Sequence, residues 1–260
     1  MLNKHRDSPF VTISIDVHTS QEQNRLQRLE NETLGRLLLA LQQNNLTATW
    51  AIASPDISMA AKAICDVDAS HEIAILADST WVGPEVGRTH FARELLRRVN
   101  EARDGGRAIS TLAMYRGRID EHLDLLVKHR INLIREVSLP TKNRPRKMRA
   151  KSLRYGLWQA TPVLQIPTVQ RWWQQRTRGL LRRIVREATE EKAPVHITFD
   201  IAEISSGGPA AWHNVLQTLQ QIAQLHARGN IAVGTLCEVC RIYSRIRSTR
   251  PARSILRPAA

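Results

Sequence analysis

Short apolar segments alternate with longer segments of helical periodicity along the chain, and this alternation limits the accessible folds more than any other feature. The apolar segment at residues 9–16 precedes leucines at helical spacing over 25–44, and "HEIAILA" precedes the amphipathic "THFARELLRRVNEAR". The same alternation of an apolar segment and a helical pattern recurs late in the chain, where "VHITFDIA" precedes a helical pattern over 210–228. Such alternation is typical of βα units around a parallel sheet or barrel, an α/β fold. In these folds the chemistry lies at the carboxyl ends of the strands.

The chain has 260 residues, which is enough to bury one large core. We expect a single domain over residues 1–243, followed by a basic, disordered tail over 244–260 that is rich in arginine, serine and proline. No apolar run approaches the roughly 18–20 residues that a membrane-spanning helix needs. The N-terminus lacks the apolar stretch and small-residue cleavage site of a secretory signal, so a cytoplasmic location is expected by default.

Positive charge dominates the composition. The 38 lysines and arginines outnumber the 24 acidic residues, which gives a formal net charge of +14. Three basic clusters contain no acidic residue, and they cover residues 142–154, 171–186 and 241–258. Such clusters favour a polyanion as partner, meaning nucleic acid or an anionic surface such as lipid headgroups or acidic glycans. The alternative is that they form the solvated surface of a basic protein.

Polar side chains follow the predicted strands. They are Asp16 and His18 after the first strand, Asp78 after the third, Tyr115 and Arg116 after the next, and Asp200 and Glu203 after the late strand. Carboxylate and imidazole groups that converge on one face can hold a metal ion or perform acid/base chemistry. A divalent metal is therefore a candidate cofactor, although none is assigned firmly. Alternatively, Asp16 caps a loop or pairs with an arginine, and Arg116 is a candidate for that partner.

The order of several segments resembles the motifs of the polysaccharide deacetylases, the NodB-like enzymes of carbohydrate esterase family 4. The segments are "VTISIDVHTS", "LTATWAIA", "SHEIAILADSTW", "MYRGRID", "YGLWQATPVLQIP", "VHITFDIAEISSGG" and "ARGNIAVGTLCEV". Together they run through nearly the whole chain. The resemblance implies a distorted, incomplete (β/α) barrel of the glycoside hydrolase/deacetylase type.

The resemblance also implies a reaction, the hydrolysis of an acetamide. In the family a divalent metal polarises the carbonyl and the attacking water, an aspartate removes the proton of that water, and a histidine protonates the leaving amine. Asp16 falls on the position of the base and Arg116 on the arginine that orients it. Asp200 falls on the position of the general-acid histidine. These three are the predicted catalytic residues.

The metal-ligand positions are where the chain departs from the family. Val17 replaces the ligand aspartate, and Leu76 and Thr80 replace the two ligand histidines. Leucine has no donor atom, and a lone threonine hydroxyl is a poor zinc ligand. In a branch of the family that reads Asp-x-Glu, His18 would stand in place of the glutamate. His18 and Asp78 are therefore the predicted metal ligands of an altered, oxygen-rich shell, which with Asp16 and Asp200 would suit magnesium or manganese.

The chain is thus identified as a degenerate member of this family. We predict a domain whose catalysis is impaired or altered and whose cleft still binds a carbohydrate or other ligand, with Arg116 and three aromatic residues, Trp50, Trp81 and Tyr115, around its mouth. One alternative is an active metal-dependent N-deacetylase, a hydrolase of non-peptide carbon–nitrogen bonds with a non-standard metal shell. The other is a cytoplasmic polyanion-binding protein that uses the basic clusters.

Overall fold

The computed structural model describes residues 8–18, 24–53, 57–115, 119–136, 150–162, 164–166, 177–191 and 193–248. Its strands are β1 (Phe10–Val17), β2 (Thr49–Ile52), β3 (Glu72–Ala77), β4 (Thr111–Met114), β5 (Leu133–Arg135), β6 (Ala150–Ser152), β7 (Trp158–Ala160), β8 (Leu164–Ile166), β9 (Val195–Asp200) and β10 (Ala232–Gly234). Its helices are α1 (Asn24–Gln43), α2 (Ile57–Val67), α3 (Arg88–Asp104), α4 (Leu123–Lys128), the short η1 (Arg154–Gly156), α5 (Thr177–Glu191), α6 (Ile201–Ser206), α7 (Gly208–Ala227) and α8 (Leu236–Ser248). None of the helices in these ranges is both long and apolar enough to span a bilayer.

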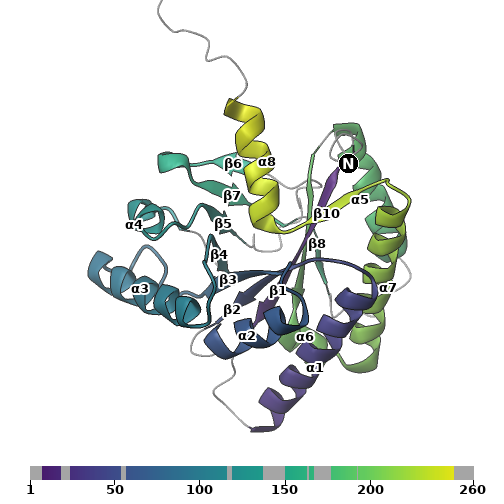
Figure 1. Cartoon of the computed structure of the whole chain (residues 1–260), viewed down its shortest axis with the longest axis horizontal. Coiled ribbons are helices and arrows are strands. Elements are labelled where there is room, and N and C mark those ends of the chain that lie inside the picture. The colour runs from purple at the N-terminus through teal and green to yellow at the C-terminus, as the bar shows by residue number, and fades with distance from the viewer. Residues whose placement is uncertain are drawn as a thin grey trace, which may run out of the picture.

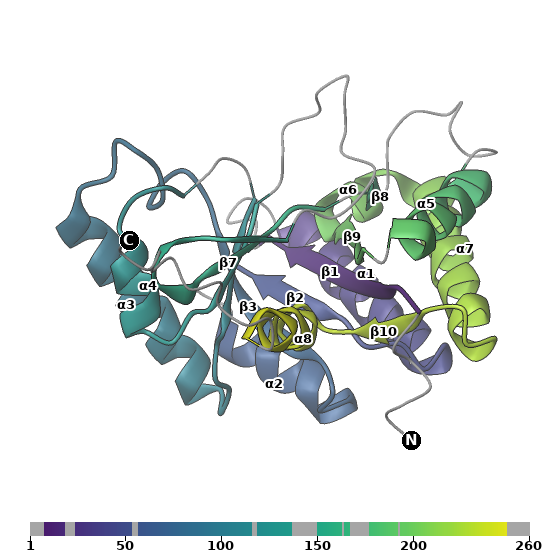
Figure 2. The same ribbon diagram turned by 90° about the horizontal axis from the view of Figure 1, so that it is seen from above.

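All these strands belong to one sheet, in the order β6-β7-β5-β4-β3-β2-β1-β9-β8, and β10 pairs with the first residues of β1 (Figure 1). The pairs are parallel except for β6 with β7. The sheet curls into a half-barrel, and helices flank it (Figures 1 and 2). This arrangement confirms the predicted distorted, incomplete (β/α) barrel.

The two faces of the sheet differ in chemistry. The odd-numbered residues of β1 from Val11 to Val17 are apolar and join the main core. Because side chains alternate along a strand, Thr12, Ser14 and Asp16 point the other way, into the curl. A second, small apolar cluster lies on that inner face and consists of Ala51, Ala74, Leu76 and Ala113. Its alanines leave room inside the curl for larger polar groups.

Helix α8 lies across the amino-terminal end of the curled sheet and contacts both β1 and β5 (Figure 2). Its first turn is held by Glu72 at the start of β3, whose carboxylate accepts hydrogen bonds from the Cys237 amide at 2.9 Å and from two threonine hydroxyls. Burial raises the pKa of Glu72, and these hydrogen bonds oppose the rise. Thr235 and Glu238 form a reciprocal capping box, with bonds of 2.8 and 3.3 Å, that fixes where the helix begins.

Two boundaries differ from those expected. The predicted strand "VHITFDIA" ends at Asp200, and α6 begins at Ile201 because the Asp200 carboxylate accepts hydrogen bonds from the next amides and caps that helix. Helix α8 continues through Ser244 to Ser248, past the predicted start of the tail. Residues 249–260 lie outside the described ranges, so the division into domain and tail stays a prediction.

Ala113 tests whether the inside of the curl is filled. Its side chain is 1% exposed, and it lies in register with Arg135 on β5. We expect Ala113→Leu to lower the free energy of unfolding by about 1–3 kcal/mol, because the larger side chain would collide with groups inside the curl. Urea denaturation measures the change. The control is Ala63→Leu at an exposed position of α2. Equal losses in the two variants would mean that the curl has free space.

Candidate functional site

Asp16 and Arg135 form a buried ion pair at the centre of the curl. Asp16 lies near the end of β1 and Arg135 ends β5, and the two residues are 2% and 0% exposed. The guanidinium donates hydrogen bonds to both carboxylate oxygens, from Nη1 to Oδ1 at 2.5 Å and from Nη2 to Oδ2 at 2.9 Å. Nη1 also donates to the hydroxyl of Ser14 at 2.7 Å. This fork matches the planar carboxylate, so the pair fixes both side chains.

The ion pair depends on the curl of the sheet. β2, β3 and β4 separate β1 from β5. In a flat sheet the two strands would be roughly 19 Å apart, which is too far for an arginine and an aspartate to meet. The side chains touch because the intervening strands bend around them. The alanines on the inner faces of these strands give the guanidinium the space it occupies.

The carboxyl of Asp16 is under opposing electrostatic influences. Burial raises its pKa, and the guanidinium of Arg135 opposes the rise. The carboxylate of Asp200, its register partner on β9, adds to the rise. Protonation of Asp16 would leave the Arg135 guanidinium as an unpaired buried charge, which is strongly unfavourable. Pairing with Arg135 therefore favours the ionised carboxylate, against the effect of burial.

His196 lies deeper in the curl, on the inner face of β9, and is held as a neutral ring. Its Nδ1 is 2.7 Å from the hydroxyl of Thr12, and its Nε2 is 3.1 Å from the hydroxyl of Ser14. Burial lowers the pKa of His196 well below 6.5, and the positive charge of Arg135 lowers it further. Ser14 thus connects the neutral imidazole to the charged guanidinium.

His18 follows β1 directly and contacts residues from two other strand ends. Its Nε2 lies 3.5 Å from Oδ2 of Asp200, within range for an ion pair, yet neither atom has a hydrogen-bond partner among the described residues. The ring of Tyr115 lies edge-on to the imidazole, with centroids 4.0 Å apart. The side chain of His18 is 24% exposed. Burial lowers its pKa, but the carboxylates of Asp200, Asp16 and Glu30 outweigh this effect and raise the pKa above 6.5.

The remaining two acidic residues of the predicted site have local partners. Oδ1 of Asp200 accepts the amides of Ala202 and Glu203 at 2.9 and 3.2 Å, so this oxygen caps α6. Oδ1 of Asp78 accepts the amide and the hydroxyl of Thr80 at 2.8 and 2.5 Å. Across the described ranges, no three His, Cys, Asp or Glu side chains are grouped so that they could hold a metal ion. The metal-ligand roles of His18 and Asp78 stay predictions.

A zinc ion of the family type does not fit the residues at its ligand positions. Val17 faces the main core on the outer side of the sheet. Leu76 belongs to the small apolar cluster inside the curl. Thr80 is exposed, and its hydroxyl donates to Asp78. The three positions therefore offer two aliphatic side chains and one hydroxyl, which is not a donor set for zinc.

Two of the three aromatic residues predicted at the mouth are buried elsewhere. Trp50 is 0% exposed and packs in the main core. Trp81 is 1% exposed and stacks on Phe91. The prediction for Trp50 is wrong because Ala51 faces into the curl, so its neighbour on the strand must face the outer helices. Of the three, Tyr115 lies at the strand ends.

Arg135 is the residue that sequence reasoning missed. Arg116, which was predicted to orient the base, lies outside the described residues, so its role stays a prediction. The arginine that grips Asp16 comes instead from the next strand along the chain. One signal was available, since Arg135 directly follows the apolar run "INLI". An arginine that ends a buried strand is seldom left without an acidic partner.

No family model and no curated protein matches the chain, whereas solved structures do. A putative polysaccharide deacetylase from Mycobacterium smegmatis superposes with a TM-score of 0.70 at 14% identity, covering 98% of this chain and 96% of that chain. The Puue allantoinase gives 0.65 at 11% identity, covering 97% and 94%. A mutant, with restored enzymatic activity, of a carbohydrate esterase family 4 pseudoenzyme from Bacillus anthracis gives 0.53 at 14% identity, covering 91% and 69%.

These similarities show the class of fold. The chain has the polysaccharide deacetylase fold, as the order of its motifs predicted. A pseudoenzyme is among the proteins that share this fold, which is consistent with a degenerate member.

The buried ion pair can be tested against an exposed pair of the same type. Arg135→Met would leave Asp16 buried without a partner, so we expect the free energy of unfolding to fall by about 3–5 kcal/mol. Replacing both residues, as Asp16→Leu with Arg135→Met, should recover most of this loss. The control is Arg88→Met, which removes a bidentate arginine from Asp124 on the surface and should change little. A loss in Arg135→Met no larger than in the control would contradict the assigned role.

The pKa values of the two histidines of the site should be shifted in opposite directions from the ordinary value of 6.5, upward for His18 and downward for His196. In an NMR titration we expect the ring of His18 to protonate above pH 6.5, while His196 stays neutral well below it. His18 thus stabilises the fold fully below pH 6.5, and its contribution is lost as the pH rises through its folded pKa. His196 has the opposite sign, because its contribution is lost as the pH falls. A midpoint near 6.5 for His196 would contradict its burial as a neutral ring.

Proposed function

We propose that this protein is a deacetylase-fold protein whose hydrolytic chemistry is impaired and whose strand ends bind a carbohydrate. The state of Asp16 carries the proposal. A general base needs a free lone pair within hydrogen-bond reach of the water that it activates. Both oxygens of Asp16 accept hydrogen bonds from Arg135, and the residue is 2% exposed. Because Asp16 is 2% exposed, little of its carboxylate is open to a water, and in this state it acts as a structural anion.

The ligand positions of the family support the same proposal. The metal would have to raise the acidity of the water and polarise the carbonyl. Val17 and Leu76 supply no donor atom, and the hydroxyl of Thr80 is engaged with Asp78. Among the residues that the structure describes, these positions therefore provide neither an exposed base nor the family's ligands for a Lewis acid. Within the described ranges, the guanidinium of Arg135 is a fixed cation inside the barrel, and it cannot coordinate a water as a metal ion does.

Polar and aromatic groups remain accessible at the strand ends and could bind a ligand. His18, Asp78 and Tyr115 are all partly exposed there. A protonated His18 donates hydrogen bonds, the carboxylate of Asp78 accepts them, and the ring of Tyr115 offers an apolar face. Sugars need this mixture of contacts. The polysaccharide deacetylases among the structural neighbours support a carbohydrate as the ligand.

Asp200 has a different role here from the predicted catalytic one. With Oδ1 capping α6, its Oδ2 faces His18 and favours the protonated imidazole. Asp200 then positions a cationic donor for the ligand and does not transfer a proton itself. The predicted polyanion partner stays a prediction, because residues 142–149, 171–176 and 249–258 of the basic clusters lie outside the described ranges.

Impaired hydrolysis is tested by acetate release from penta-N-acetylchitopentaose. We expect no release above the buffer blank, with or without added zinc, manganese or magnesium. Asp16→Asn is the matched variant, because Asp16→Ala would leave Arg135 with only the Ser14 hydroxyl as an acceptor for its Nη1. It should be equally inactive. Turnover in the unmodified protein that disappears in a folded Asp16→Asn variant would contradict the proposal and support the active N-deacetylase with an altered metal shell.

Ligand binding is tested by calorimetry with the same oligosaccharide. We expect Tyr115→Ala to weaken binding about tenfold, because the variant loses an aromatic contact at the strand ends. Tyr155→Ala is the control, since Tyr155 is an exposed tyrosine on η1. It should bind as the unmodified protein does. No binding by the unmodified protein, or equal weakening in both variants, would contradict a carbohydrate site at the strand ends.

A further inference from the structure

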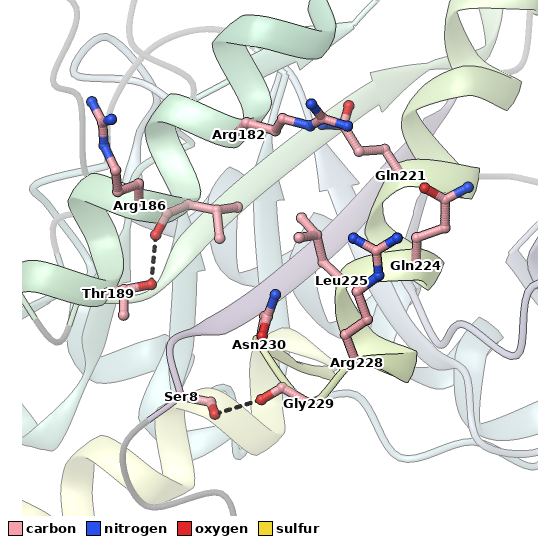
Figure 3. Close-up of a pocket in the computed structure, with 11 residues that line it drawn as sticks. Ser8, Arg182, Arg186, Thr189, Gln221, Gln224, Leu225, Arg228, Gly229 and Asn230 are labelled. Carbon is pink, nitrogen blue, oxygen red and sulfur yellow. Dashed lines mark hydrogen bonds between the residues drawn. The ribbon is translucent and has the colours of Figure 1, made fainter.

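A groove lined by charged, polar and apolar residues lies between α5 and α7, at the amino-terminal end of the barrel. Its volume is about 580 Å³, within the range of small-molecule sites. Figure 3 shows the residues that line it, with Arg182 and Arg186 on α5, and Gln224 and Arg228 on or just after α7. Ser8, which precedes β1, also lines it. Since β1 rises about 3.3 Å per residue, the groove lies roughly 25 Å from Asp16. It is therefore separate from the strand-end site.

The charge of the groove is uncompensated. Three of its lining residues are arginines, and none is acidic. Arg182 and Arg186 are one turn apart on α5, a spacing at which like charges repel each other. Within the described ranges, none of the three arginines has an ion pair or a side-chain hydrogen bond. Arg183, next to Arg182 in the chain, instead pairs with Glu187 at 2.9 Å.

The groove also contains neutral hydrogen-bond donors. Gln224 and Asn230 are exposed, and their amide groups lie on the α7 side of the groove (Figure 3). Arg182 extends from α5 toward α7, so donors from both helices border the same space (Figure 3). Leu225 and the buried Val185 form its apolar part.

We infer that this groove binds a small ligand that carries two or more phosphate groups. The guanidinium fork matches phosphate oxygens, which it can contact with two hydrogen bonds at once. A single carboxylate would leave most of the positive charge unbalanced, whereas a chain of phosphates supplies two or more negative charges in a short length. The volume of the groove suits a small molecule. This inference goes beyond the proposed function and does not depend on it.

The test is calorimetry of the 260-residue chain with inorganic pyrophosphate. We expect saturable binding that weakens with added salt, and a loss of affinity of about tenfold or more in Arg182→Gln and in Arg228→Gln. The matched control is Arg183→Gln, which removes the same charge from the adjacent position of α5. It should change the affinity by less than about twofold. Arg182, Arg183 and Arg228 are all exposed, so the three variants should fold.

Two results would overturn the inference. One is that pyrophosphate does not bind. If a single-stranded RNA binds and pyrophosphate does not, the positive charge acts as an extended surface and not as a small-molecule groove. The other is equal weakening in Arg182→Gln and Arg183→Gln, because the effect would then follow net charge alone. A second arm compares tripolyphosphate with adenosine triphosphate. Equal affinities support an inorganic ligand for the groove, and a higher affinity for the nucleotide supports a phosphorylated nucleoside.

Discussion

The ion pair between Asp16 and Arg135 joins two strands that three others separate, and the shape of the barrel depends on it. The pair can form only in a curled sheet, and once formed it holds the curl at its centre. Alanines on the inner faces of the intervening strands make the pair sterically possible. Ser14 extends it to the neutral ring of His196. Inside the curl, a connected polar network thus lies beside the small apolar cluster.

The same ion pair limits the chemistry that the proposal assigns to the strand ends. The carboxylate of Asp16 is 2% exposed, so a water has little access to it, and a guanidinium cannot coordinate water as a metal ion does. The side chains that a ligand can reach are therefore those at the mouth of the barrel, His18 and Tyr115. There the carboxylate of Asp200 raises the pKa of His18, so the site presents a hydrogen-bond donor where the family has its catalytic groups. This arrangement supports the proposed binding of a ligand at the strand ends.

The sequence predicted what local patterns determine. Hydrophobic periodicity predicts β1, β3 and β9, and the order of the motifs predicts the curled sheet. Asp16 was singled out because it ends a strand. Its partner was not found, because the contact with Arg135 depends on how far the sheet bends and not on sequence spacing. Trp50 packs in the main core and not at the mouth, because side chains alternate across the strand, and α6 begins within an apolar run because Asp200 caps it.

A crystal structure of the protein grown with millimolar zinc would test the central claim most directly. The account predicts that the guanidinium of Arg135 still grips both oxygens of Asp16 and that no zinc ion is coordinated by Asp16. Zinc bound to Asp16 and His18, with the side chain of Arg135 turned away, would contradict it. In that case the barrel would hold a metal-dependent enzyme site, and the ion pair would be the arrangement that the site adopts without the metal.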